Sequence, residues 1–565
     1  MSRTSNTQPT ETQSIMVRGI VDSTAMIAAS DTGDRKKLLD VIKQQRSGFL
    51  FSYTRPHYQL HVVDRFALYP LFYTIQDGML QVSQVVDDLL PYLKSKKLHA
   101  EGYYGTGGIG KGDRTPYTPF AGIMRIPPGH LLEYRNGQYE LIKYWSFTDL
   151  EDSPFEGSYE EACDILGSLI KQGVDRCYAH DSKMAVHLSG GIDSGSITAL
   201  LAQSKHDTIH AYAHVKPDAP DDHPTYENGY LRKYVEHYPN ISICKSHTLS
   251  YNQNLATPIR SAGNWHLVKH DSPEGRICQD LSSKKIPYLL SGVGGDELAS
   301  YGHGHQKSNR KISSDTQARR FMYRDIYLKR KLTFLARGIL GKDGPRLDSI
   351  TSTLMMQPFT EKHKWYHPNF RAVVPDLALG NLISLYWFPS TYEYRLKTLQ
   401  KSYFMIRSDM WNFLSRYYGI DYMFPLMDAD LVEFCARLPR EFFVGQEQRN
   451  MIKKGLKKYL HNDLLTGGKR PGYQPPQTGN PPKDQKDPLI LINEYRMKYS
   501  DLNGTLASSV FDLDHIDSKL KRYQSYLKKM PQKWVQTRRS IQQRLRHFQL
   551  YLNHADYINT HFDNM

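Results

Sequence analysis

The feature that most constrains this chain is a glycine turn between an apolar strand and a helix. The apolar stretch 184–188 runs directly into Ser-Gly-Gly-Ile-Asp-Ser at 189–194, and apolar residues at helical spacing follow. The two glycines let the backbone approach a ligand closely, and amide N–H groups at a helix start attract anions. Ser189 and Ser194 add hydroxyl donors, whereas Asp193 is suited to a bridging Mg²⁺. The pattern predicts a polyphosphate site rather than an ordinary turn before a helix.

A second turn of the same kind occurs about a hundred residues later. The apolar stretch 286–290 is followed by Ser-Gly-Val-Gly-Gly-Asp-Glu at 291–297. In a parallel sheet both turns would lie at the carboxyl edge, where ligands bind. Asp193 and Asp296 would then hold one or two Mg²⁺ ions against the same phosphates.

These two motifs resemble those of the asparagine synthetase family, which includes β-lactam synthetases and lasso-peptide cyclases. The first is similar to the pyrophosphatase loop of the wider ATP-pyrophosphatase superfamily, and the second to the family's second phosphate and metal motif. The resemblance implies that a carboxylate is activated as an acyl-adenylate with release of pyrophosphate, after which an amine displaces AMP. It implies ATP and Mg²⁺ as cofactors, with Asp193 and Asp296 as metal ligands. Nucleotide or phosphate contacts are expected from Leu188, Ser189, Gly190, Gly191, Asp193, Ser194, Ser291, Gly292, Gly294 and Asp296.

The N-terminal third extends the resemblance to roughly residues 45–480. The segment 64–73, Asp-Arg-Phe-Ala-Leu-Tyr-Pro-Leu-Phe-Tyr, resembles part of the family's glutaminase domain. Short strands are expected at 49–53, 57–63, 71–75 and 79–82, with a turn at 77–78. Glutamine-hydrolysing members use an N-terminal cysteine, but Ser2 stands here and the first cysteine is Cys163. We therefore expect a degenerate domain without glutaminase activity, preceded by a disordered polar tail.

Two further positions bear on the chemistry. Val293 stands where asparagine synthetases carry Glu and β-lactam synthetases carry Tyr, so the asparagine type of ammonia chemistry is in doubt. Family members place a lysine in a loop near 467–473 to stabilise developing charge. Lys469 matches best and Arg470 is the alternate, unless this is only a charged surface loop. Glu297, next to Asp296, is the second candidate catalytic residue. The segment 421–428 is similar to the family's Pro-Phe-Leu-Asp-type region, with a helix expected after it.

Composition and charge indicate where in the cell the protein is expected and what it could bind. No apolar run is long enough to cross a membrane, and the five cysteines form no metal-ligand cluster or Cys-x-x-Cys pair. Reduced thiols and the absence of a signal-peptide pattern favour a cytoplasmic location. The formal net charge is +15, and residues 519–546 hold ten Lys or Arg and no acid. A solvated helical face is the simplest interpretation of this tail and of the basic stretch 307–337; docking of an acidic peptide or nucleic acid is the alternative.

We therefore predict an α/β fold: a degenerate Ntn-hydrolase-like αββα domain at 1–150, an ATP-pyrophosphatase parallel-sheet domain at 151–500 with a helical later part, and a basic helical extension at 501–565. The favoured function is an ATP-dependent ligase that closes a lasso-peptide macrolactam. Its substrate would be a precursor or core peptide, and a leader peptidase is a possible partner. Proximity of the peptide's own amine would replace a free amine. The alternatives are a ligase using ammonia or a small amine, a tRNA-modifying ATP-pyrophosphatase, and an inactive family member.

Overall fold

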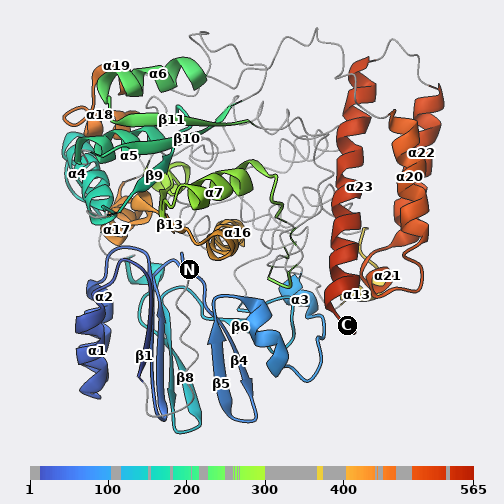
Figure 1. Ribbon diagram of the computed structural model, residues 1–565, viewed down its shortest axis with the longest axis horizontal. Helices are drawn as coiled ribbons and strands as arrows, with labels where there is room; N and C mark the ends of the chain where they lie inside the picture. Colours follow the sequence, from blue (N-terminus) through green and yellow to red (C-terminus); the bar gives the residue numbers. More distant parts are fainter. Residues whose placement is uncertain are drawn as a thin grey trace, which may run out of the picture.

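The computed structural model describes residues 13–103, 116–150, 154–178, 182–204, 207–215, 227–247, 259, 261–263, 265, 268–299, 365–372, 402–439, 442, 449–465, 487–529 and 535–565. They form a mixed α/β protein with one parallel sheet and many helices. Figure 1 shows antiparallel sheets from the N-terminal residues below the parallel sheet, and long C-terminal helices standing beside both. The predicted polar tail, the basic stretch 307–337 and the loop 467–473 lie outside the described residues.

The N-terminal unit is built on two antiparallel sheets. The larger has the order β1-β2-β3-β7-β8 and the smaller the order β5-β4-β6. The strands are β1 (Ser14–Gly19), β2 (Phe49–Arg55), β3 (Tyr58–Val63), β4 (Phe72–Gln76), β5 (Met79–Ser83), β6 (Met124–Arg125), β7 (His130–Arg135) and β8 (Gln138–Lys143). Helices α1 (Ser23–Asp31) and α2 (Arg35–Gln44) each begin at an aspartate, Asp22 and Asp34, whose carboxylate accepts a backbone N–H of the first turn. The four strands expected from the sequence are confirmed within one or two residues.

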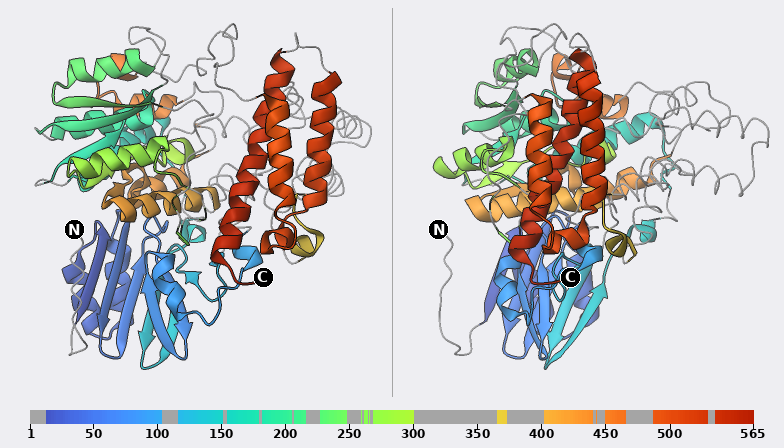
Figure 2. Two further views of the ribbon diagram at one scale, coloured as in Figure 1. Left: turned by 45° about the vertical axis from the view of Figure 1, so that its right-hand side comes forward. Right: turned by 90° about the vertical axis from the view of Figure 1, so that its right-hand side faces the viewer.

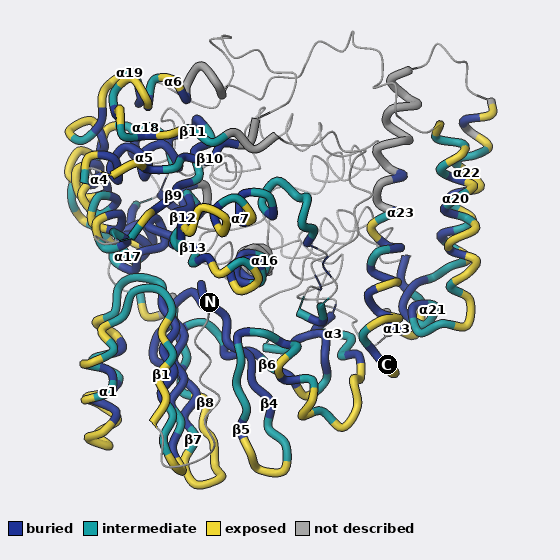
Figure 3. The backbone as a smooth tube through the Cα atoms, in the orientation of Figure 1, coloured by how far each residue is buried: buried dark blue, intermediate teal, exposed yellow. Residues whose placement is uncertain are grey.

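The next unit contains a five-stranded parallel sheet with the order β11-β10-β9-β12-β13. Its strands are β9 (Met184–His187), β10 (Ile209–Val215), β11 (Ile241–His247), β12 (Tyr288–Leu290) and β13 (Asp421–Met423). The main helices around it are α4 (Tyr159–Arg176), α5 (Ile192–Ser204), α6 (Glu227–His237), α7 (Pro273–Ser283), α16 (Ser402–Tyr418), α17 (Ala429–Arg437), α18 (Asn450–Leu456) and α19 (Asn462–Leu465). Most described residues of β9, β10, β12 and β13 are buried, as expected for a sheet covered on both faces, whereas the edge strand β11 is partly exposed (Figure 3).

The C-terminal residues form a helical bundle with its own core. Its helices are α20 (Pro488–Ser500), α21 (Leu506–Val510), α22 (Leu513–Lys529) and α23 (Val535–His561), with the short α13 (Pro368–Ala372) against it. Figure 2 shows α20, α22 and α23 side by side. The base of α23 meets the N-terminal unit, where Phe562 stacks on Phe120 with ring centroids 4.4 Å apart and His554 Nδ1 lies 3.0 Å from the Tyr103 hydroxyl. No described helix is apolar over a length that would cross a membrane.

The N-terminal unit is locked to the parallel-sheet unit by buried polar contacts. Arg125 donates two hydrogen bonds to Asp409 on α16, at 2.7 and 2.6 Å. The Tyr69 hydroxyl donates to the carbonyl oxygen of Tyr422 at 2.6 Å. The segment 64–73 therefore has a structural role here, since Arg65 also lies 3.2 Å from Glu433 on α17.

Candidate functional site at the carboxyl edge of the parallel sheet

The strand order defines where this sheet binds ligands. The chain goes from β9 outward to β10 and β11, then returns to the other side of β9 to form β12 and β13. The order therefore reverses between β9 and β12, and open α/β sheets bind ligands at such a point, beyond the carboxyl ends of the strands. The two glycine turns follow β9 and β12, which are paired neighbours, so the turns meet at this switch point.

The first turn is organised by its own serines. The Ser189 backbone N–H donates to Ser194 Oγ at 3.0 Å, and the two hydroxyl oxygens lie 3.1 Å apart. Leu188 is buried and donates its N–H to the Tyr212 carbonyl oxygen. Helix α5 begins at Ile192, so its N-terminal amides and positive dipole end face the same edge. The structure thus gathers Leu188, Ser189, Gly190, Gly191, Asp193 and Ser194 in one loop.

The second turn lies directly against the first. A Cβ added to Gly295 would lie 2.4 Å from Asp193 Cγ, and one added to Gly292 would lie 3.0 Å from the Ser194 backbone nitrogen. Only glycine permits this approach, which leaves the Asp193 carboxylate between the two turns. Gly294 instead has φ +99° and faces the Leu426 carbonyl. Ser291 is buried at the end of β12.

Several predicted residues are only partly placed or not placed. The backbone of Asp296 and Glu297 lies in the helical turn Gly295–Ala299, but their side chains lie outside the described residues, as do Lys469 and Arg470. Among the described residues no group of three or more His, Cys, Asp or Glu side chains forms a ready metal site. Asp296 directly follows Gly295, which touches Asp193, so two carboxylate-bearing residues originate at one point. This fits Mg²⁺, which takes one or two protein carboxylates and completes its shell with phosphates and water.

Arg449 is a site residue that the sequence did not reveal. Its Nη1 lies 3.4 Å from Asp193 Oδ2, and its side chain is only 9% exposed. A Cβ at Gly191 would lie 3.7 Å from the same Nη1. Arg449 also has φ +64°, a left-handed conformation that is uncommon for a residue other than glycine. No sequence motif surrounds Arg449. Its position directly before α18 is the only local feature that could have pointed to it.

Helix α18, which begins after Arg449, is held by a glycine contact with α4. A Cβ at Gly455 would lie 2.2 Å from the Cys163 carbonyl oxygen, and one at Gly167 would lie 1.9 Å from the Gly455 carbonyl oxygen. The two helix backbones therefore touch. This close packing fixes the start of α18, and with it Arg449, beside the first turn.

Val293 gives the site no acid or base at its position. Its side chain is buried, with 6% exposure. As expected from the sequence, this position has no counterpart of the Glu carboxylate of asparagine synthetases or the Tyr phenol of β-lactam synthetases.

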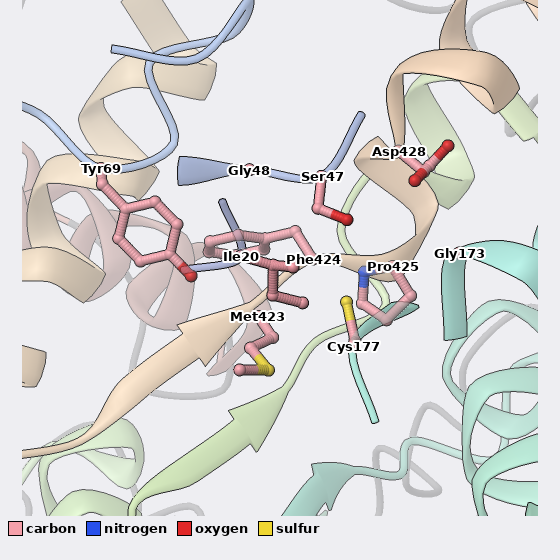
Figure 4. A pocket seen from close by; sticks show the side chains of 10 residues that line it. All are labelled: Ile20, Ser47, Gly48, Tyr69, Gly173, Cys177, Met423, Phe424, Pro425 and Asp428. Atoms are coloured by element: carbon pink, nitrogen blue, oxygen red, sulfur yellow. The ribbon is translucent and has the colours of Figure 1, made fainter. Parts of the chain in front are cut away.

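A separate cavity lies between the N-terminal and parallel-sheet units (Figure 4). Neither the Cys177 thiol nor the Asp428 carboxylate, which line this cavity, is arranged as a reactive group. Burial raises the pKa of the Cys177 thiol to about 12, so the thiol stays protonated. The Asp428 carboxylate is held by Arg176 at 2.7 Å. We interpret this cavity as a packing gap between the two units, because its other lining residues are largely apolar or contribute backbone: Ile20, Ser47, Gly48, Tyr69, Gly173, Met423, Phe424 and Pro425.

A strand-order switch with two glycine turns and an acidic residue between them is typical of a ligand-binding open α/β sheet. The sequence profile of the asparagine synthase family matches residues 166–536, which is more than half of the chain. This chain belongs to the asparagine synthase family.

Individual relatives are more distant. Asparagine synthetase [glutamine-hydrolyzing] 3 of Bacillus subtilis (strain 168) is 29% identical over 141 residues, which is 25% of this chain and 22% of that protein. Amidase chyE of Penicillium rubens is 28% identical over 168 residues, 29% of this chain and 24% of that protein. The matches thus span less than a quarter of each relative. A glutamine PRPP amidotransferase structure from B. subtilis shows 7% identity and a TM-score of 0.17, covering 42% of this chain and 71% of that one; that score is too low to support a structural argument.

Proposed function

We propose that this chain is an ATP-dependent ligase that adenylates a carboxylate and joins it to an amine, releasing pyrophosphate and then AMP. The parallel-sheet unit acts as the ATP-pyrophosphatase domain, and the N-terminal unit as a degenerate glutaminase-like domain. The observation that carries the proposal is the contact of the two glycine turns at the switch point, with the Asp193 carboxylate between them. Family membership points to the same reaction class.

The residues at this edge would have different roles in binding and activating ATP. The amides at the start of α5 and the hydroxyls of Ser189 and Ser194 bind phosphate oxygens, as a helix N-terminus favours. Asp193 and Asp296 would hold Mg²⁺, which supplies charge neutralisation on the phosphates. Arg449 contributes a buried cation beside them. Substrate carboxylate oxygen attacks the α-phosphorus, the bond to pyrophosphate breaks, and positive charge at this edge stabilises the leaving group.

The acceptor amine is the finer part of the proposal. We propose a peptide substrate whose own α-amine attacks an activated acidic side chain, closing a macrolactam. The apolar Val293 supports this, because it offers a free ammonia or small amine no ionisable partner at that position. Folding the peptide in the site supplies the amine at an effective concentration that reaches roughly 10⁵–10⁸ M in well-oriented systems. The second candidate is aspartate with ammonia, favoured by the likeness to an asparagine synthetase over 141 residues.

The deciding experiment is pyrophosphate release from ATP and Mg²⁺ with two substrates in parallel. One is a synthetic peptide with a free α-amine and a single internal glutamate, and the other is aspartate with ammonium. Peptide-dependent release with a product one water lighter by mass spectrometry supports macrolactam closure, whereas release with aspartate and ammonium supports the second candidate. Release with neither contradicts the ligase proposal for these substrate classes.

Substitution of Asp193 tests the metal assignment within the same assay. Asp193→Asn should abolish pyrophosphate release while leaving the unfolding temperature near that of the wild type. Asp175→Asn is the matched control, because Asp175 lies exposed on α4, away from the site, and pairs with Lys171 on the same helix. Wild-type release by Asp193→Asn would remove Asp193 from the metal site.

A further inference from the structure

The face of the parallel sheet opposite α5 carries an acid–imidazole pair at the same carboxyl edge. His187 ends β9, and its Nε2 lies 3.1 Å from Oε1 of Glu274 in the first turn of α7. Both side chains are 16% exposed. Helix α7 connects β11 to β12, opposite in direction to the crossover through α5, so right-handed connections place α5 and α7 on opposite faces.

The register of the strands confirms which side chains share the α7 face. Tyr212 pairs with His187 across β10 and β9, and its hydroxyl donates to Asp280 on α7 at 2.6 Å. Tyr422 on β13 follows the same alternation, through Leu289 and Ala185, and its hydroxyl donates to Glu274. His187 therefore lies on the α7 face of the switch point, beside the turn that enters α5.

The groups around the pair leave the imidazole as the proton acceptor. Burial raises the pKa of Tyr422 well above its usual value, and burial likewise raises the pKa of Cys278, whose Sγ lies 3.2 Å from the Tyr422 hydroxyl. Burial also raises the pKa of Tyr212, on the neighbouring strand. All three side chains stay protonated at neutral pH. Asp280, further along α7, is held by Lys284 at 2.6 Å. Glu274 lies in the first turn of α7, where the helix dipole favours negative charge.

We propose that His187, oriented by Glu274, is the general base of the amide-forming step. The inference rests on the proposed ligase function and adds the residue that activates the amine. The imidazole takes one proton from the ammonium group, and the freed amine nitrogen forms a bond to the acyl carbon. The bond from that carbon to the phosphate oxygen of AMP breaks, and the second proton leaves the nitrogen to solvent. Such a base is needed because aliphatic amines are largely protonated at neutral pH. A base held by a carboxylate is a recurring arrangement in acyl transfer.

The arrangement of the edge supports this assignment. The first glycine turn leads from β9 into α5 on one face of the sheet, and His187, the last residue of β9, lies on the other face of the same edge. Val293, between Gly292 and Gly294 of the second turn, supplies no competing base. The pair thus offers a proton acceptor at the carboxyl end of β9, the strand that carries the first glycine turn.

The test separates adenylation from amide formation, using whichever substrate supports pyrophosphate release by the wild type. His187→Gln and Glu274→Gln should retain ATP–pyrophosphate exchange within about threefold. Amide formation should fall by roughly 10²–10⁴-fold in His187→Gln, the usual contribution of a general base. Hydroxylamine, which is unprotonated at neutral pH, should restore acyl transfer to this variant. The limb of the wild-type pH–rate profile that reports the base should also be lost.

The control is His210→Gln, since His210 lies on the same face of β10, away from Glu274, with Nδ1 3.9 Å from the Cys244 sulfur. It should leave both steps unchanged. Equal loss of exchange and amide formation in His187→Gln would show a structural role, and unchanged amide formation would show no role; either result overturns the inference. Wild-type protein without pyrophosphate release on either substrate would instead overturn the proposed function, so the two failures are distinguishable.

Discussion

At the residue scale, substitution of Arg449 tests most directly whether a buried cation contributes to nucleotide binding. If it binds phosphate, Arg449→Asn should weaken binding of Mg²⁺ and a non-hydrolysable ATP analogue by roughly 10- to 100-fold, since a hydrogen bond to a charged group contributes about 1.5–3 kcal/mol. Asparagine tolerates the left-handed backbone of this position, so charge is tested apart from strain. Calorimetric titration measures the Kd.

The matched variants make that result specific. Arg449→Lys keeps a charge but not the planar fork, so its affinity should fall between those of the wild type and Arg449→Asn. Lys457→Met, at the exposed end of the same helix, should bind as the wild type does. Unchanged affinity in Arg449→Asn would mean that Arg449 pairs with Asp193 for structural reasons alone.

A second residue-scale prediction concerns acid stability. His61 is fully buried between Ser52 and Gln59, and burial lowers its pKa to about 3. Between pH 6.5 and 3 the unfolded chain binds this proton and the folded chain does not. The stability is thus fully present above pH 6.5 and falls as pH drops, with a slope of up to about 1.4 kcal/mol per pH unit. His61→Gln should flatten the fall of the unfolding temperature over this range, whereas exposed His57→Gln should not. An unchanged slope in His61→Gln would contradict the prediction.

The sequence predicts this site unevenly because local motifs carry only local information. Ser189, Asp193 and Gly292 lie in turns whose chemistry is readable from glycine, hydroxyl and carboxylate spacing. Arg449 and Glu274 reach the same edge through helix packing, over separations that no short pattern records. The site residues supplied by tertiary contacts therefore become visible only in the structure.

At the scale of elements, the touching backbones of α4 and α18 make a sharp prediction. A methyl group at Gly455 would collide with the Cys163 carbonyl, so Gly455→Ala must push α18 away. We expect a loss of about 1–3 kcal/mol in the free energy of unfolding, as for other overpacked contacts. Nucleotide affinity should fall as well, because α18 carries Arg449 at its start. Denaturant titration and the same calorimetry measure both, with Lys457→Ala as control. A stable Gly455→Ala protein with normal affinity would show that α18 does not position the site.

Element prediction succeeded where the hydrophobic pattern is strong. The strands at 49–55 and 184–187 and the helix at 429–437 match the expected positions because apolar runs or helical spacing mark them. Strand β1 was not expected. It pairs with β2 along one edge, but most of its side chains are exposed or half-exposed, so it lacks the alternation that marks a half-buried strand.

At the scale of the whole molecule, the N-terminal unit acts through the interface that it forms. Its contacts reach β13, which pairs with β12, and α16, which packs against β13, through Tyr69 and Arg125. The C-terminal bundle meets the same unit through Phe562. These partners are hundreds of residues apart, so no local sequence pattern indicates how the units contact one another. A unit expected to lack glutaminase chemistry thus has a physical reason to remain, because it supports both other parts.

The buried pair Arg125–Asp409 tests that role. Its side chains are 1% and 4% exposed, so Arg125→Ala removes two buried, charge-assisted hydrogen bonds to the Asp409 carboxylate in the interface. Loss of one partner of a buried pair costs about 3–5 kcal/mol, whereas replacing both by apolar residues of similar size is often nearly neutral. We therefore expect Arg125→Ala to lower the unfolding temperature and to speed proteolysis between the units, and Arg125→Met with Asp409→Leu to recover much of the loss. If the double variant were as unstable as Arg125→Ala, the hydrogen bonds of the pair would be needed to position the two units, and apolar packing could not replace them. If Arg125→Ala were as stable as the wild type, the interface would not depend on this pair.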